Sequence, residues 1–169
     1  MIISPSQQLA TFAAQLSFDA IPTVVIQKTE DLLVDWFGSC VAGKGARAAE
    51  AIAAFAKQMG PQTGAAEGLI NRTRTSAYFA AMVNAAASHV AEQDDVHNGS
   101  VFHPATVVFP VALALAQTQG STGKQMLAAA VVGYEVGIRV GEFWAARTIR
   151  FSIPPARRAR WRRRQPPGI

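Results

Sequence analysis

The chain repeats one pattern, in which apolar residues recur at helical spacing and glycine or proline marks each break. Leu9, Phe12 and Leu16 follow this spacing, which predicts a first amphipathic helix over residues 7–16. The same pattern predicts further helices over residues 22–43, 46–59, 76–90, 105–117 and 124–143. Residues 62–75 are polar and contain glycine, so a connecting segment is expected there. The pattern therefore predicts an all-α fold of about six helices.

Composition agrees with a single helical domain. The chain has 169 residues, of which 50% are hydrophobic and only 8% aromatic. Cys40 is the only cysteine, which excludes an intrachain disulfide and a thiolate metal cluster and suits a reducing compartment. It lies in an apolar run, so a buried and inert thiol is expected. Because neither a signal peptide nor a membrane span is recognisable, we expect a soluble, cytoplasmic protein.

The basic charge is concentrated at the C-terminal end. The formal net charge is +5, but eight of the sixteen basic residues are arginines within residues 145–169, which contain no acid. The remainder has eight basic and eleven acidic residues, a net charge of −3. We therefore predict a helical domain over residues 1–143 and a disordered Arg/Pro-rich tail over 144–169. Polyanion binding by this tail is an alternative hypothesis, although no specific nucleic acid and no membrane partner are expected.

A cluster of ionisable residues joins two of the apolar helices. Its members fall within twelve positions: Glu92, Asp94, Asp95, His97, Ser100 and His103. Such a loop can direct carboxylates and imidazoles towards one cavity for proton transfer, with His103 as base or acid and Asp95 orienting it or binding a substrate hydroxyl. In the structural interpretation, by contrast, the acids and Ser100 cap the next helix while the histidines are solvated. Spacing alone leaves both interpretations open.

Two other interpretations of these motifs are less favoured. A divalent metal bound by Asp95, His97 and His103 is a rival, but the spacing is not that of a compact helical zinc motif. His89 lies on an alanine-rich helix, where a packed or capping histidine is more usual than a ligand. The segment 120–124 contains Gly-Ser-Thr-Gly-Lys but lacks the phosphate-loop spacing, so it is expected to be an interhelical turn.

The same cluster carries a family resemblance. Residues 85–104, which include Asp94-Asp95 and His103-Pro104, resemble the signature of the MmgE/PrpD family. Residues 9–12, 16–22 and 35–43 are similar to the family's opening region, and 74–77 also fits. Members include 2-methylcitrate dehydratases, cis-aconitate decarboxylases and iminodisuccinate epimerases. The resemblance extends over about residues 7–143.

The resemblance implies both an architecture and an activity. The family has a larger helical domain that is completed by later helices and a smaller α+β lid domain, usually in a homodimer. Its members use no metal or organic cofactor and act on small di- and tricarboxylates by moving a proton α to a carboxylate. Carried over by motif, the catalytic residues would be His103, Asp95 and Glu92, although many relatives have aspartate at the last position. The neighbouring residues Asp94, His97 and Ser100 would bind the small carboxylate substrate.

The C-terminal end departs from the family pattern. Codons from Phe151 onward, regrouped by one base, are compatible with the family's Phe-His-Thr-Thr-Gly-Thr-Ala-Gly segment. We therefore expect a frameshift between about Trp144 and Phe151 that removes a second catalytic histidine, later substrate-binding lysines and the lid. On this interpretation the chain is an N-terminal part that is inactive alone. A helical interaction protein that dimerises through uncovered apolar surface is a further alternative.

Overall fold

The computed structural model describes residues 4–152, with side chains up to Trp144. This part of the chain is mostly helical, which confirms the predicted fold class. Its elements are α1 (Pro5–Gln15), η1 (Phe18–Ala20), α2 (Thr23–Ala42), α3 (Arg47–Met59), β1 (Ala66–Gly68), β2 (Thr73–Thr75), α4 (Ala77–Val90), α5 (Pro104–Gln119) and α6 (Gly123–Ser152). No helix in the described part is long and apolar enough to cross a membrane.

Two elements differ from the prediction. The connecting segment contains a short antiparallel hairpin, in which Ala66 pairs with Thr75 and Gly68 with Thr73. Helix α6 also continues past the predicted end at Phe143 to Ser152. No proline or glycine lies between Phe143 and Pro154, so the local sequence contains no helix breaker over that stretch. The rest of the predicted disordered tail, residues 153–169, lies outside the described residues.

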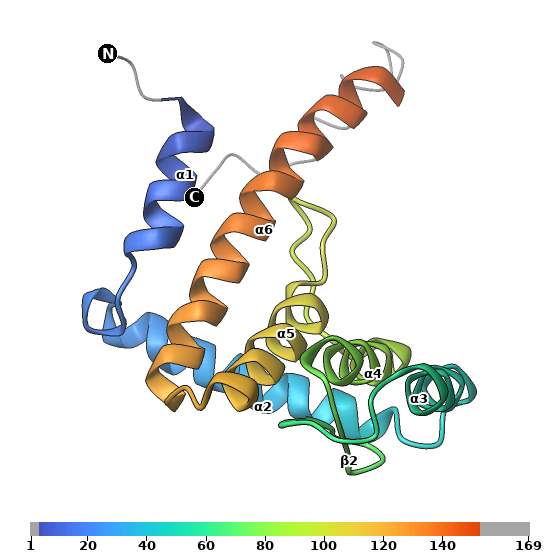
Figure 1. The fold of residues 1–169 in the computed structure, drawn as a ribbon. Helices are drawn as coiled ribbons and strands as arrows, with labels where there is room; N and C mark the ends of the chain where they lie inside the picture. The colour runs from blue at the N-terminus through green and yellow to red at the C-terminus, as the bar shows by residue number, and fades with distance from the viewer. Residues whose placement is uncertain (1–3, 153–169) are drawn as a thin grey trace.

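Helices α2, α3, α4 and α5 form a layer, and α6 with α1 projects from it as an arm (Figure 1). Helix α2 crosses beneath α4 and α5, and α3 packs on the far side of α4. Helix α6 packs against α5 and then rises away from the layer, with α1 beside it. The turn between α5 and α6 is the expected interhelical one, because Gly120 ends α5 in the left-handed conformation at φ 65°. The site described below lies in the segment that joins α4 to α5.

Small residues let the helices of the layer pack closely. One buried cluster joins α2, α3 and α4 through Cys40, Ala53 and Ala87, which confirms that the Cys40 thiol is buried. A second joins α2, α5 and α6 around Trp36, whose ring centroid lies 5.7 Å from that of Phe109. These clusters hold α4 and α5 in a fixed relative position, on which the geometry of the site depends.

Three glycines on one face of α6 bring the segment between α4 and α5 against this helix. A Cβ atom at Gly133 would lie 2.7 Å from the Val108 side chain, and one at Gly137 would lie 2.6 Å from the Phe102 ring. A Cβ atom at Gly141 would lie 2.6 Å from the Ser100 side chain. The glycines recur every four residues and so share a helix face. Residues 91–103, here called the site loop, therefore run directly along α6 (Figure 1).

Candidate functional site

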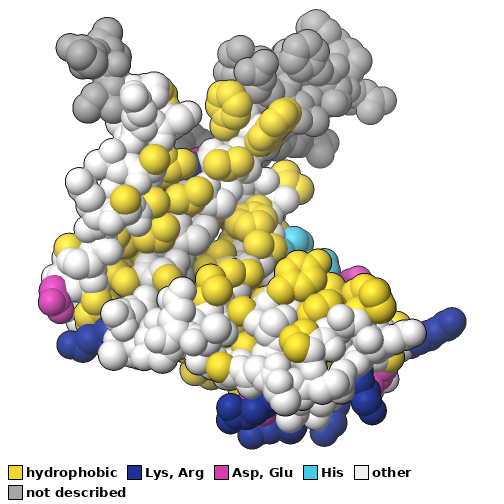
Figure 2. Space-filling model, viewed as in Figure 1, with side chains coloured by type: hydrophobic (Ala, Val, Ile, Leu, Met, Phe, Trp, Pro, Cys, Tyr) yellow, Lys and Arg dark blue, Asp and Glu magenta, His cyan; other side chains and the backbone are white. Residues whose placement is uncertain are grey.

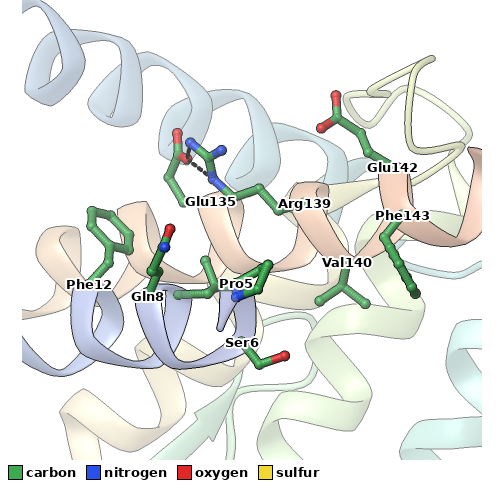
Figure 3. Close-up of a pocket in the computed structure, with 10 residues that line it drawn as sticks. Pro5, Ser6, Gln8, Phe12, Glu135, Arg139, Val140, Glu142 and Phe143 are labelled. Carbon is green, nitrogen blue, oxygen red and sulfur yellow. Dashed lines mark hydrogen bonds and ion pairs between the residues drawn. The ribbon is translucent and has the colours of Figure 1, made fainter. Parts of the chain in front are cut away.

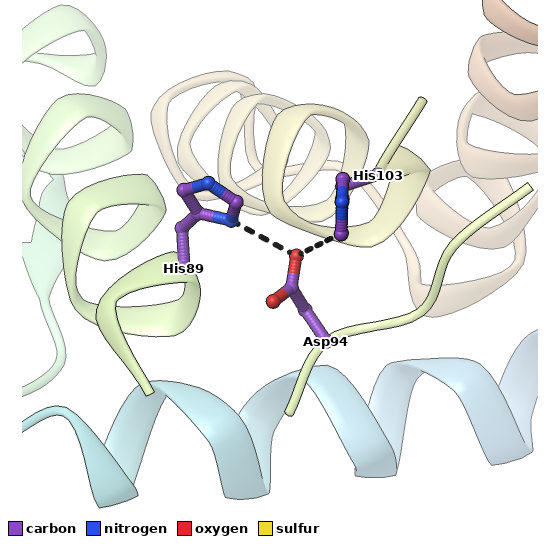
Figure 4. A group of neighbouring side chains, drawn as sticks. All are labelled: His89, Asp94 and His103. Carbon is purple, nitrogen blue, oxygen red and sulfur yellow. Dashed lines mark hydrogen bonds and ion pairs between the residues drawn. The ribbon is translucent and has the colours of Figure 1, made fainter. Parts of the chain in front are cut away.

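Two histidines converge on one buried carboxylate (Figure 4). The Nδ1 atoms of His89 and His103 lie 3.0 Å and 2.9 Å from the same oxygen of Asp94, Oδ2. The Asp94 side chain is only 1% exposed, whereas the two imidazoles are 59% and 44% exposed. Their ring centroids are 5.3 Å apart, in an edge-to-face arrangement. We call these three residues the His–Asp–His cluster.

The backbone of the site loop positions these side chains. His89 lies in the last turn of α4, which ends at Val90 with Ala91 as its C-cap. Glu92 then takes a left-handed conformation with φ 50°, which turns the chain sharply and allows Asp94 to point back towards α4. His103 is the cap residue of α5, directly before Pro104 in the first turn. The cluster therefore joins the C-terminal end of one packed helix to the N-terminal end of another.

Asp95 holds the start of α5 in place. Its Oδ1 accepts the backbone N–H of Ala105 at 2.8 Å, and its Oδ2 accepts the hydroxyl of Tyr134 at 2.8 Å. Burial raises the pKa of Tyr134 far above its ordinary value, and the hydrogen bond to Asp95 and the negative charge of Asp95 raise it further. The Tyr134 hydroxyl therefore stays protonated and acts as a donor. Asp95 thus fixes the helix turn that follows His103, while Asp94 contacts the imidazole itself.

His97 and Ser100 form a turn at the tip of the site loop. The backbone N–H of His97 donates to the carbonyl of Phe102 at 2.8 Å, which closes an isolated bridge. The Nδ1 atom of His97 accepts the backbone N–H of Ser100 at 3.2 Å and lies 2.9 Å from the Ser100 hydroxyl. These two residues therefore bind each other. Among the described residues, neither of these two has a hydrogen bond or ion pair with a member of the His–Asp–His cluster.

The structure thus divides the six predicted site residues into separate groups. Asp94 and His103 meet in the cluster, Asp95 caps α5, His97 and Ser100 form the turn, and the side chain of Glu92 is exposed. His89 was not among the predicted site residues, and it was expected to be a packed or capping histidine. Its imidazole is instead largely exposed and paired with Asp94. The only signal in the sequence was its place shortly before the acidic pair.

The arrangement can exchange protons with a ligand. If Nδ1 is the protonated nitrogen of each ring, then each Nε2 has a lone pair that can accept a proton. A carboxylate beside an imidazole also stabilises the imidazolium that forms. The weighed metal set of Asp95, His97 and His103 does not gather among the described residues. The atoms that do lie within 4.8 Å of one another belong to His89, Asp94 and His103.

Two grooves with mostly apolar linings occur in the described part of the chain, and neither is lined by a residue of the His–Asp–His cluster. The first has a volume of about 750 Å³ and runs between α1 and α6, with Leu9, Phe12 and Phe143 among its lining residues (Figure 3). The second, of about 600 Å³, runs between α4 and α5 and is lined by residues that include Tyr78 and Val111. Hydrophobic side chains are accordingly visible over both the arm and the layer (Figure 2).

Comparison with known proteins identifies the family. The sequence model of the MmgE/PrpD N-terminal domain matches residues 7–156, which extends beyond the expected limit near Phe143. A cis-aconitate decarboxylase from Aspergillus terreus is 28% identical over 144 residues, covering 81% of this chain and 29% of that protein. The cis-aconitate decarboxylase-like protein oryM from Aspergillus oryzae is 29% identical over 141 residues, covering 79% of this chain and 29% of that protein.

The family match covers most of the chain, whereas the chain covers only part of the relatives. It spans 29% of the length of each of the two curated relatives named above. No solved structure matches. Since the domain model matches from residue 7 to residue 156, and the site loop lies within that match, the chain belongs to the MmgE/PrpD family.

Proposed function

We propose that this chain is the N-terminal part of a cofactor-independent lyase that acts on small di- or tricarboxylates, with His103 as the acid–base group. The observation that carries the proposal is the contact of 2.9 Å between His103 and the buried carboxylate of Asp94, within the region that matches the family. The names of the relatives support a decarboxylase or dehydratase type of reaction. A cytoplasmic location and a homodimer belong to the same proposal.

In the proposed step, Nε2 of His103 removes a proton α to a carboxylate, and Asp94 stabilises the imidazolium. In the dehydrating case, the electron pair of the broken C–H bond forms a carbon–carbon double bond, the C–O bond to the hydroxyl group breaks, and the leaving oxygen takes a proton from the His103 imidazolium, so that water departs. In the decarboxylating case, His103 starts as the imidazolium. The carbon–carbon bond to the carboxylate breaks, carbon dioxide leaves, and the electron pair left on the carbon takes the proton of His103. His89 would position Asp94, and Asp95 would position His103 through the first turn of α5. Glu92, which is exposed, and the turn formed by His97 and Ser100 would meet the substrate.

The proposed site is only part of a complete one. None of its residues is a lysine or arginine, although a substrate with two or three carboxylates requires cationic partners. In this proposal those partners and a second histidine come from the part of the relatives' length that this chain does not span. We therefore expect the 169-residue chain to bind such acids weakly and to turn them over slowly or not at all.

Histidine NMR spectroscopy tests the proposal. The chain has three histidines, so each Cε1–H signal can be assigned by substitution. Titration with cis-aconitate or 2-methylcitrate should shift the signal of His103, the proposed acid–base group, together with that of His97, which would meet the substrate, and acetate at matched ionic strength should not. Equal shifts for acetate would contradict the substrate class. Steady turnover by the purified chain, followed in the same spectra, would contradict the claim that it is inactive alone.

The alternative of polyanion binding gains no support from the described part of the chain. The arginines on which it depends occupy positions 147–164, beyond the last described side chain, Trp144. The described domain carries the net negative charge calculated above. Sequence-selective nucleic acid binding that is lost on deletion of residues 145–169 would revive the alternative.

A further inference from the structure

We propose that a small pocket between the end of α3 and the β1–β2 hairpin binds a phosphate group, either as inorganic phosphate or as part of a small organic phosphate. The pocket has a volume of about 140 Å³, and none of its lining residues belongs to the His–Asp–His cluster. The inference is therefore independent of the proposed reaction, and either one can fail without the other.

Three parts of the fold meet around this pocket. Lys57 comes from the last turn of α3, Gln62 from the connection that follows, and Arg74 from β2. Gly68 of β1 keeps the space between them open, because a Cβ atom there would lie 3.5 Å from the Thr73 hydroxyl oxygen. At about 30 Å³ per water, the volume equals roughly four or five water molecules, well below that of sites for drug-sized ligands. The pocket therefore suits one small group.

The two cationic side chains that line the pocket are available to a ligand. Among the described residues, neither Lys57 nor Arg74 makes a side-chain ion pair. Glu67 lies opposite Arg74 in the hairpin, but it pairs instead with Arg72 at 2.7 Å. An arginine fork binds two oxygens of a phosphate group through parallel N–H donors, and a lysine adds a compact positive charge. Lys57 and Arg74 together supply both kinds of contact.

Several acceptors that would repel an anion are already covered by hydrogen bonds. Gln62 Nε2 donates to the backbone carbonyl of Lys57 at 2.6 Å and to that of Gly60 at 3.3 Å, both at the end of α3. The Thr75 hydroxyl donates to the carbonyl of Pro61 at 2.9 Å. The carbonyl end of a helix disfavours a nearby anion, and these contacts reduce that effect. Positive charge therefore dominates inside the pocket.

The charge around the pocket is local. Lys and Arg side chains gather along the lower edge of the layer in Figure 2, where Figure 1 places the β1–β2 hairpin. The domain as a whole carries the net negative charge calculated above, so its long-range field does not attract anions. Phosphate binding at this edge would therefore depend on the lysine and the arginine of the pocket itself.

Amide NMR spectroscopy of the full chain tests the site. Titration with sodium phosphate, at an ionic strength held constant with sodium chloride, should shift the backbone amide signals of Gln62 and Arg74 along one saturable curve with a millimolar Kd. Glycerol phosphate is titrated in the same way, and the tighter of the two probes identifies the source of the phosphate group. Acetate should bind about tenfold more weakly, because its single charge engages one cation instead of two.

Substitutions separate the pocket from the general charge of the domain. Arg74→Gln and Lys57→Gln should each weaken phosphate binding about tenfold, because each removes a hydrogen bond to a charged group. Arg74→Lys keeps the charge but loses the planar fork, so its effect should be smaller. Arg47→Gln also removes one positive charge from α3 but lies outside the pocket lining. It is the matched control and should change the Kd by less than about twofold, because salt screens the distant charge.

The measurement distinguishes this pocket from the arginine-rich end of the chain. Phosphate held by the arginines at positions 147–164 would shift other amide signals and would not respond to Arg74→Gln. In the wild-type chain, shifts of Gln62 and Arg74 that stay linear with both phosphate probes would overturn the proposal without any variant. Equal weakening by Arg47→Gln and Arg74→Gln would overturn it too, because the effect would then be one of net charge.

Discussion

Replacement of Asp95 by alanine should destabilise the fold more than an ordinary loop substitution. The carboxylate accepts one hydrogen bond from the backbone of Ala105 and one from the hydroxyl of Tyr134, both at 2.8 Å. Ala105 is fully buried, so water cannot replace the lost acceptor. The variant therefore leaves one buried backbone donor and one partly buried hydroxyl without a partner.

The expected magnitude follows from these two donors. An unsatisfied buried donor costs about 1–3 kcal/mol, and loss of a helix cap costs typically about 1 kcal/mol. We therefore expect Asp95→Ala to lower the free energy of unfolding by about 2–4 kcal/mol. At roughly 2–4 °C per kcal/mol for a chain of this size, the Tm should fall by about 4–16 °C. Asp95→Asn can retain both contacts, with Tyr134 as acceptor, and should lose less than about 1 kcal/mol.

Urea unfolding followed by far-UV circular dichroism measures these differences. Tyr134→Phe removes one of the two contacts, and the double variant completes a mutant cycle with an expected coupling of about 0.5–3 kcal/mol. If Asp95→Ala lost less than about 1 kcal/mol, or Asp95→Asn lost as much as Asp95→Ala, the assignment of Asp95 to the support of α5 would be refuted.

Three further predictions concern the packing and chemistry of the fold. Gly137→Ala places a Cβ atom 2.6 Å from the Phe102 ring and should lower the free energy of unfolding in urea by about 1–3 kcal/mol. Gly38 has open space around it, so the control Gly38→Ala should raise that free energy by about 0.5–1 kcal/mol. Equal effects of the two substitutions would contradict the packing argument. Burial raises the pKa of the Cys40 thiol to about 11, so the unfolded chain loses this proton first as pH rises. Stability should therefore fall between about pH 9 and 11, by up to roughly 2.7 kcal/mol, with a shallower slope in Cys40→Ala. Val101 is 78% exposed and has φ 50°, so Val101→Gly should relieve strain and raise stability by roughly 1 kcal/mol; a loss would show that the strain is absent.

The helices were predictable because each buries an apolar face whose spacing is visible in the sequence. The hairpin was not, because its strands have three residues each and are too short to show alternation. The end of α6 was misplaced for a different reason. The end at Phe143 was predicted because the amphipathic pattern is lost in the Arg/Pro-rich segment from Ala145 onward, whereas the first proline after Phe143 is Pro154. A helix ends where the local sequence no longer supports it, and neither glycine nor proline lies between Phe143 and Pro154.

The site was predictable as a segment but not in its pairings. The concentration of acids and histidines indicated residues 91–103 as the candidate site loop, and spacing alone left a helix-capping role equally open. Which acid faces which histidine depends on backbone direction: Asp94 and Asp95 are neighbours outside a helix, and their side chains point to different partners. His89 joins the cluster only because α4 packs against α5. That contact is tertiary, and no local pattern shows it.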